Sequence, residues 1–212
     1  MKQTNINPAL REYIESEILP RYKKFDKAHN IDHALTVIER SLQLAAHYDV
    51  VTDLVYTIAA FHDTGLCEGR DTHHTASARI VREDKFLASL FSAEEIETIA
   101  DAVEDHRASS KQPPRTIYGK IVAEADRLID GETIVRRTVL YGLAHYPTLS
   151  REQHFARTLA HLREKYSRGG YLRLWLPESP NAERLRVFQD TIENEQAILA
   201  LFDKFFDEES KT

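Results

Sequence analysis

The chain has 212 residues, of which 42% are hydrophobic and 29% charged, with only 7 Gly and 7 Pro; this composition favours a packed helical protein over disorder or an all-β sandwich. Its net charge of -6 provides no basic stripe, which argues against duplex nucleic acid as a partner. The sequence has no run of about 18 apolar residues and begins without the apolar segment of a signal peptide, so we expect a cytoplasmic protein that does not enter a membrane.

The first two predicted helices are amphipathic. Residues 7–19 carry apolar side chains at helical spacing up to Pro20, which is expected to end the helix. A second helix is predicted over residues 32–47, with Asp32 as its N-cap. His33 therefore lies in the first turn of this helix.

The next two predicted helices bring further histidines. The helix that begins at Thr52 is apolar on nearly every side, so we expect it to be buried. It runs directly into His62 and Asp63. After a polar loop, another helix is predicted over residues 72–88, and His73 lies at its start.

Two later helices place polar side chains on inward faces. Ser92 and Glu95 form a capping-box pattern, and the apolar stripe that follows puts His106 on the buried face. A helix over residues 117–129 has Asp126 between apolar residues of the same face. Because a buried carboxylate loses its hydration, Asp126 is expected to have a charged partner.

The remainder of the chain, residues 132–212, is predicted to form three further helices. The last of them, over residues 180–206, has a long apolar stripe. We expect it to cover the core or to join a second copy of the chain in a homodimer. The fold class is therefore all-α, and because no stretch has the composition of a linker, the whole chain is predicted to be a single domain.

Three of these helices supply four candidate metal ligands, which are His33, His62, Asp63 and Asp126. Two carboxylates and two imidazoles at interior positions indicate a cation, because buried charges are costly unless they are paired or coordinated. Cys67 is the only cysteine, which excludes a thiolate zinc site and a disulfide framework. Mixed imidazole and carboxylate ligation suits Mn, Fe, Co, Ni or Zn. Such an ion makes hydroxide from water near neutral pH and neutralises phosphate oxygens.

Several motifs follow one another in a characteristic order. They are His33, FHDTG at 61–65, His73 with Ser77 and Ala78 after it, His106, and KIVAEADRLID at 120–130. In this order they resemble the HD-domain superfamily of metal-dependent phosphohydrolases. The match covers roughly residues 25–135, which implies a helical bundle of the HD type as the core and additional C-terminal helices over residues 136–212.

The resemblance implies a role for each of these residues. The metal ligands it implies are His33, His62, Asp63 and Asp126, in agreement with the burial argument. It further implies that His73 and His106 line the site, where they bind a second metal ion or contact the substrate phosphate. Mg joins the divalent ions that the site is expected to take.

Three neighbouring positions need separate interpretation. His74 adjoins His73, and because one residue turns a helical side chain by about 100°, only one of the two is expected to point inward; the spacing to Ser77 favours His73. Lys120 occupies the same place as in relatives and is predicted to reach a phosphate. Thr36 stands where many members of the family carry Arg, so substrate contacts from that position are not expected to follow the family.

The predicted function is hydrolysis of a phosphate ester or anhydride in a nucleotide or another small phosphorylated metabolite. A metal-bound water held by Asp63 and Asp126 would attack phosphorus, while His73, His106 and Lys120 would stabilise the charge that develops on the phosphoryl oxygens. Two alternatives remain open at this stage. One is an HD-fold di-iron oxygenase of the inositol oxygenase type, and the other is a non-catalytic metal- or ligand-binding module.

Overall fold

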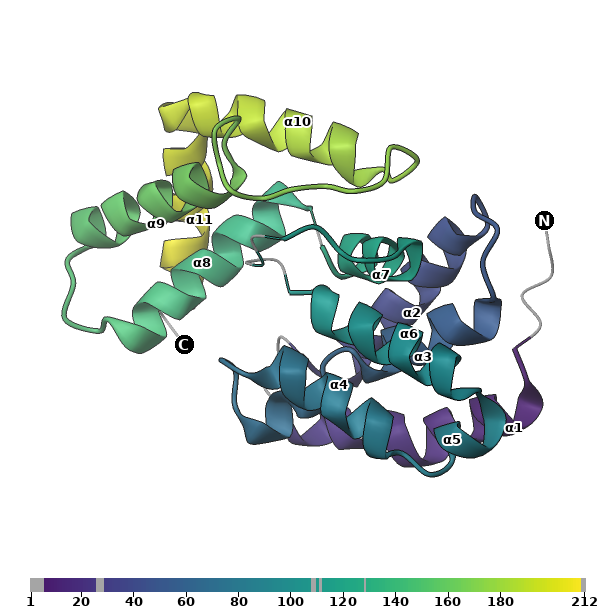
Figure 1. The fold of residues 1–212 in the computed structure, drawn as a ribbon. Coiled ribbons are helices and arrows are strands. Elements are labelled where there is room, and N and C mark those ends of the chain that lie inside the picture. Colours follow the sequence, from purple (N-terminus) through teal and green to yellow (C-terminus); the bar gives the residue numbers. More distant parts are fainter. Residues whose placement is uncertain (1–5, 26–28, 108–109, 111, 128, 211–212) are drawn as a thin grey trace. The chain divides into compact units, whose positions relative to one another are not determined.

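The structure is a computed structural model of residues 1–212, and it describes residues 6–25, 29–107, 110, 112–127 and 129–210. Within these ranges the chain forms eleven α-helices, one π-helical segment and two 3-10 helices, without a strand (Figure 1). The all-α prediction is confirmed. Among the described helices, each is too short or too polar to cross a bilayer.

The chain divides into two compact units. The first comprises Met1–Arg127 together with Trp175–Ser179, and the second comprises Leu128–Leu174 and Pro180–Thr212. The first unit thus contains the predicted HD core (25–135) as far as Arg127 and, in addition, a short segment from far along the chain. The prediction of a single domain stays a prediction.

The first unit begins with a helical stretch of three types. It runs through α1 (Pro8–Tyr13), the π-helical η1 (Ile14–Ile18) and the 3-10 helix η2 (Leu19–Lys24). The side chain of Asn7 caps α1 by accepting the backbone N–H groups of Ala9 and Leu10. Pro20 does not end the stretch as predicted, because it lies in the first turn of η2, where its missing N–H is not needed.

Helices α2 (Ile31–Ala45) and α3 (Thr52–Phe61) follow. The predicted cap of α2 is wrong by two residues: the Asn30 side chain, rather than Asp32, accepts the backbone N–H of His33 at 3.0 Å. This shift leaves His33 in the first turn. Every residue of α3 from its third position onward is buried, as its continuous apolar pattern predicts.

After η3 (Thr64–Glu68) the chain forms α4 (His73–Glu83), α5 (Leu87–Leu90) and α6 (Ala93–Asp105). The single helix predicted over residues 72–88 is therefore wrong. Asp84 interrupts it, because its carboxylate accepts the backbone N–H groups two and three residues later, at 2.9 and 3.0 Å, and so starts α5.

Helix α6 starts at the predicted capping box, in which Ser92 and Glu95 each bond to the other's backbone. Helix α7 (Ile117–Asp126) ends three residues before the predicted Ile129. Asp126 is thus the last residue of α7, and the chain turns extended directly after it.

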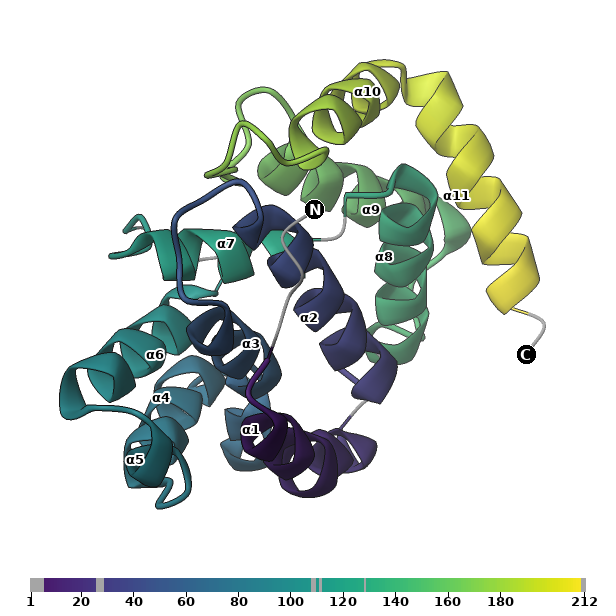
Figure 2. The same ribbon diagram turned by 90° about the vertical axis from the view of Figure 1, so that its right-hand side faces the viewer.

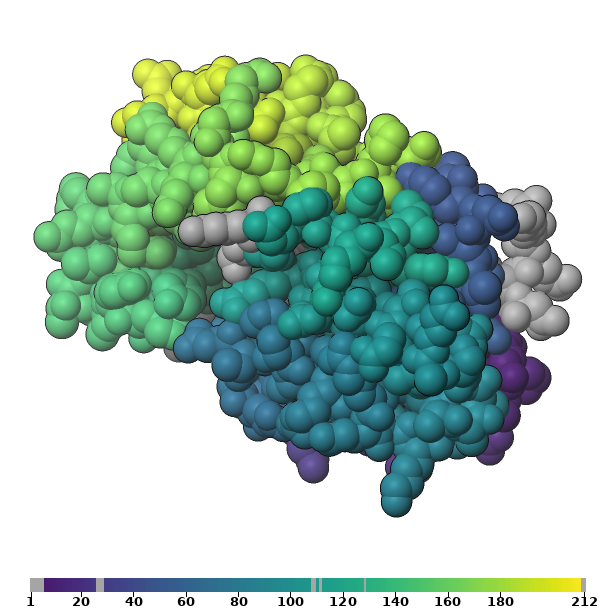
Figure 3. All heavy atoms as spheres, viewed as in Figure 1, coloured from purple at the N-terminus to yellow at the C-terminus, as the bar shows by residue number. Residues whose placement is uncertain are grey.

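Helix α3 is central to the first unit, since it packs against α2, α6 and α7 (Figure 2). The fully buried side chains here include Phe61, Ile58, Ile99 and Ile121. Burial of each such side chain contributes about 1.5–3 kcal/mol. In the space-filling view the side chains of α4, α6 and α7 cover the face of this unit that is turned to the viewer (Figure 3). The C-terminal end of α3 is buried inside the unit, since Phe61 and His62 are both 0% exposed.

The second unit consists of four helices rather than the predicted three. They are α8 (Gly131–His145), α9 (Arg151–Tyr166), α10 (Asn181–Glu193) and α11 (Glu195–Glu209). The helix predicted over residues 180–206 is split at Asn194, whose side chain accepts the backbone N–H of Ala197 at 3.2 Å and caps α11. The core of this unit includes Phe202, Leu162 and Ile198.

Candidate metal centre

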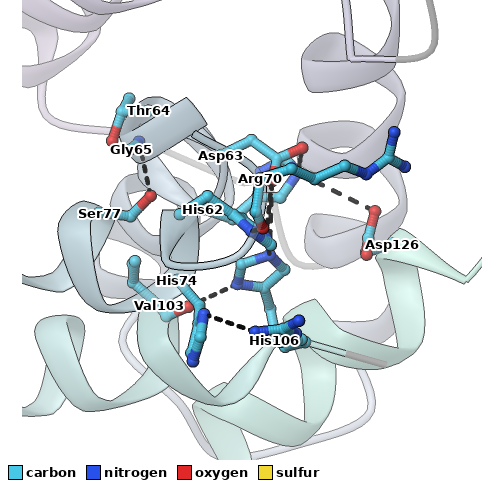
Figure 4. A network of polar contacts seen from close by, with 12 residues as sticks. His62, Asp63, Thr64, Gly65, Arg70, His74, Ser77, Val103, His106 and Asp126 are labelled. Carbon is cyan, nitrogen blue, oxygen red and sulfur yellow. Dashed lines mark hydrogen bonds and ion pairs between the residues drawn. The ribbon is translucent and has the colours of Figure 1, made fainter. Parts of the chain in front are cut away.

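Three helices of the first unit deliver the four predicted metal ligands to one place. His33 lies in the first turn of α2, His62 and Asp63 directly follow α3, and Asp126 ends α7. His33 Nε2 is 3.2 Å from His62 Nε2 and 3.2 Å from Asp126 Oδ1. Asp63 Oδ2 is 3.2 Å from His62 Nε2 and 3.6 Å from His33 Nε2. Figure 4 shows the adjacent residues His62 and Asp63 together with Asp126, which comes from a different helix.

A second pair of histidines lies on the other side of Asp63. His73 Nε2, from the start of α4, is 3.2 Å from His106 Nε2 at the end of α6. Both nitrogens face Asp63 Oδ1, at 3.5 Å for His73 and 3.4 Å for His106. Each oxygen of the Asp63 carboxylate therefore faces its own pair of imidazoles.

Three of the four imidazoles are oriented in the same way, by a contact between Nδ1 and the backbone carbonyl three residues earlier. The contacts are His62 with Ala59 at 2.8 Å, His73 with Arg70 at 2.7 Å, and His106 with Val103 at 2.6 Å. A carbonyl only accepts, so Nδ1 carries the hydrogen and donates it. In a neutral imidazole Nε2 is then a free lone pair, which is the form that binds a metal.

This arrangement fits a divalent cation. In the pair of His73 and His106, both Nε2 lone pairs face each other at 3.2 Å, and only a shared proton or cation removes the repulsion. Two ligand nitrogens at about 2.1 Å from one ion lie roughly 3.0–3.4 Å apart, at octahedral or tetrahedral angles. The donor atoms form two ligand groups that share Asp63, one with His33 and His62 and the other with His73 and His106. Within each group the donor atoms lie within 4.8 Å of one another. The donor set of nitrogen and oxygen suits the ions that the sequence predicts.

The electrostatics of the cluster keep its carboxylates ionised. Burial alone would raise the pKa of Asp63, which is 3% exposed, but the surrounding imidazoles hold that pKa well below its usual range. Burial lowers the pKa of His33, yet its hydrogen bonds with Asp126 and Asp63 outweigh this and raise the pKa to about 9. Burial and the neighbouring charge of His106 lower the pKa of His73. These are the properties of a cation-binding site.

The structure brings His73 to Asp63 and turns His74 elsewhere. His74 Nδ1 lies 3.4 Å from the guanidinium of Arg107, consistent with the rotation between neighbouring helical residues. Lys120 lies on α7, about 9 Å along the helix axis from Asp126. Its predicted contact with a phosphate stays a prediction.

A close approach of η3 and α4 supports the cluster. Gly65 N–H donates to Ser77 Oγ at 2.8 Å, inside the protein. A Cβ at Gly65 would lie 2.2 Å from His73 O, so only glycine fits there. Gly65 and Ser77 both belong to the motifs identified in the sequence. Their contact depends on how η3 folds back onto α4, which the sequence alone does not show.

The family comparison covers this centre. The sequence model of the HD domain family matches residues 30–130, which include the five residues of the two ligand groups and Asp126. Neither the search of curated proteins nor the search of solved structures found a match. The family match, the helical fold and the His and Asp cluster agree, and residues 30–130 of the chain form an HD domain.

Proposed function

We propose that the protein is a metal-dependent phosphohydrolase that cleaves a phosphate ester or anhydride in a nucleotide or another small phosphorylated metabolite. The superfamily is of the metal-dependent hydrolase type. The observation that carries the proposal is Asp63, which lies between two pairs of imidazoles whose Nε2 atoms all face it.

His33, His62 and Asp126 would hold one ion together with Asp63 Oδ2, and His73 with His106 would hold a second at Asp63 Oδ1. When bound, a divalent ion lowers the pKa of water and offsets the negative charge of phosphate oxygens.

One edge of the cluster is open to solvent. The side chains of His33 and Asp126 are 22% exposed and that of His73 is 14% exposed, whereas the side chain of His62 is fully buried. A substrate would therefore approach from the side of His33, Asp126 and His73. His62, Asp63 and His106 would form the floor of the site.

Asp126 would orient a water at this edge. Burial alone would raise the pKa of Asp126, but its hydrogen bond with His33 and the charge of His62 lower that pKa below the usual range. The Asp126 carboxylate therefore stays ionised. Its exposed part would accept a hydrogen bond from the water and would not keep the proton that the water releases. The net charge of -6 offers no general attraction for a polyanion.

The first test is elemental analysis of the purified protein and of Asp126→Ala, followed by phosphate release from nucleotides and sugar phosphates with added Mn, Co, Ni or Mg. We expect one or two ions per chain in the wild type, and loss of both metal and phosphate release in the variant. Asp49→Ala, which alters an exposed loop carboxylate of the same unit, is the matched control and is expected to keep both.

Other outcomes select the alternatives. A wild type that binds no metal and stays inert with every added ion would contradict the proposal and favour a non-catalytic module. Two irons per chain, colour and no phosphate release would favour a di-iron oxygenase, since two ligand groups sharing Asp63 also suit a pair of irons.

A further inference from the structure

The end of α3 leaves two backbone groups that must find partners inside the protein. In a continuing helix the N–H of Asp63 would bond to the carbonyl of Ala59. The helix stops at Phe61, and Ala59 O instead faces Nδ1 of His62 at 2.8 Å. The N–H of Asp63 and the carbonyl of Ala60 are therefore left without helical partners in a buried place, where unpaired groups are costly.

One hydroxyl satisfies both groups. Tyr22 Oη donates to Ala60 O at 2.9 Å and accepts the N–H of Asp63 at 3.3 Å. Tyr22 is fully buried, as is His62, and Asp63 is 3% exposed, so bulk water does not replace this contact. The hydroxyl bridges the last turn of α3 and the residue after it.

The ring of Tyr22 is itself held in place. It packs edge-on against Phe25, with ring centroids 5.4 Å apart, and lies 6.2 Å from the ring of His62. Tyr22 belongs to η2, upstream of residues 30–130, which match the HD domain. A segment outside the family match thus contacts the backbone that carries two successive ligands.

We infer that Tyr22 is a positioning residue of the metal centre. Its hydroxyl fixes the turn through His62 and Asp63 so that each oxygen of Asp63 faces its own pair of imidazoles. The inference rests on the proposed metal centre. Since Asp63 belongs to both ligand groups, loss of the hydroxyl weakens both metal sites together.

The test compares Tyr22→Phe with Tyr13→Phe. Both substitutions remove one hydroxyl and its hydrogen bond in the first unit, but Tyr13 Oη bonds to Asp84, at 2.5 Å, away from the ligands. Mn²⁺ binding is measured by titration calorimetry, and Tm is measured on the same samples. We expect Tyr22→Phe to weaken Mn²⁺ binding at every occupied site by roughly 10- to 100-fold, the range for residues that orient ligands. Tyr13→Phe is expected to lower Tm without changing the Kd for Mn²⁺.

Equal Mn²⁺ affinity in Tyr22→Phe and the wild type would overturn the positioning role and leave the proposed function intact. A wild type that binds neither Mn²⁺ nor any other divalent ion would overturn both.

A second measurement needs no variant and keeps the inference testable if Tyr22→Phe does not fold. The amide of Asp63 in the metal-free wild type is expected to exchange its hydrogen as slowly as the amides at the centre of α3, because it is bonded to a buried hydroxyl. Exchange at the rate of an exposed loop amide would overturn the inference.

Discussion

His33 links the charge state of the cluster to metal binding. Without a metal its pKa is about 9, because Asp126 and Asp63 favour the protonated imidazole more strongly than burial disfavours it. The unfolded value is about 6.5. A folded pKa above the unfolded one stabilises the protein fully below about pH 6.5, and this stability is lost as pH rises through about 9.

At neutral pH the His33 imidazole carries a proton on Nε2, the nitrogen that would bind the metal. A divalent ion must displace it from His33 Nε2, so metal affinity is expected to rise between pH 7 and 9, up to about tenfold per pH unit, while the Tm of the metal-free protein falls over the same interval. Titration calorimetry at several pH values measures the first quantity and thermal unfolding the second.

Two substitutions check the assignment to this residue. His33→Gln is expected to reduce the pH dependence of the Tm. His47→Gln, which changes an exposed histidine of the same unit, is expected to retain it. An affinity that is constant from pH 7 to 9 in the wild type would contradict the prediction.

At the residue scale, the sequence predicts the candidate ligands from a local pattern, and the structure brings their side chains together. His33, His62, Asp63 and Asp126 each stand at the end of a helix with a clear apolar stripe, so the position of each side chain follows from helical periodicity. Tyr22 has no comparable signal. In the sequence it is one more aromatic residue after an amphipathic stretch, and only the folded chain shows its hydroxyl under Asp63.

At the scale of elements, the close approach of η3 to α4 makes a sharp prediction about Gly65. A Cβ there would lie 2.2 Å from His73 O and 2.5 Å from Ser77 N, and both are backbone atoms that cannot yield without moving a helix. Gly65→Ala is expected to lower the free energy of unfolding by about 1–3 kcal/mol, the usual cost of overpacking. Because it displaces His73, it is also expected to weaken metal binding.

Chemical unfolding measures the stability, and Mn²⁺ titration measures the binding. Gly169→Ala is the control, because a Cβ at Gly169 meets no atom within 4 Å. Stability within about 0.5 kcal/mol of the wild type, the range of ordinary surface changes, would show that the approach of η3 to α4 is looser than described.

Helix existence was predictable from the sequence, whereas several boundaries were not. Three of the errors have a common physical cause, because at each of them a short polar side chain competes for the backbone: Asn30 starts α2, Asp84 separates α4 from α5, and Asn194 separates α10 from α11. The sequence shows many Asn and Asp residues that are able to do this. Which of them caps a helix depends on the direction in which the core requires the chain to turn.

At the scale of the whole molecule, the first unit is not continuous in sequence. Residues Trp175–Ser179 belong to it, although the chain on either side of them belongs to the second unit. Leu176 is 4% exposed and joins the core that contains α2, α3 and α7. The N–H of Trp175 donates to Glu124 Oε2 at 2.8 Å. The segment therefore packs on α7, the helix that ends in Asp126.

Glu124 tests the contribution of this segment. It is fully buried and lies on α7 two residues before Asp126, so the two side chains leave the helix about 160° apart, and Glu124 faces Trp175 while Asp126 faces His33. Glu124→Ala removes the acceptor of a partly buried N–H and leaves a cavity. The expected loss of stability is about 1–3 kcal/mol.

Hydrogen exchange locates that loss. In Glu124→Ala the amide of Trp175 is expected to exchange faster than in the wild type, because its bond to the carboxylate is absent. Glu124→Gln is the matched control, since its amide oxygen still accepts the N–H and is expected to preserve most of the protection. If all three proteins exchange the Trp175 amide at the same rate, Glu124 does not hold the segment on α7, and Leu176 then accounts for its packing by hydrophobic burial alone.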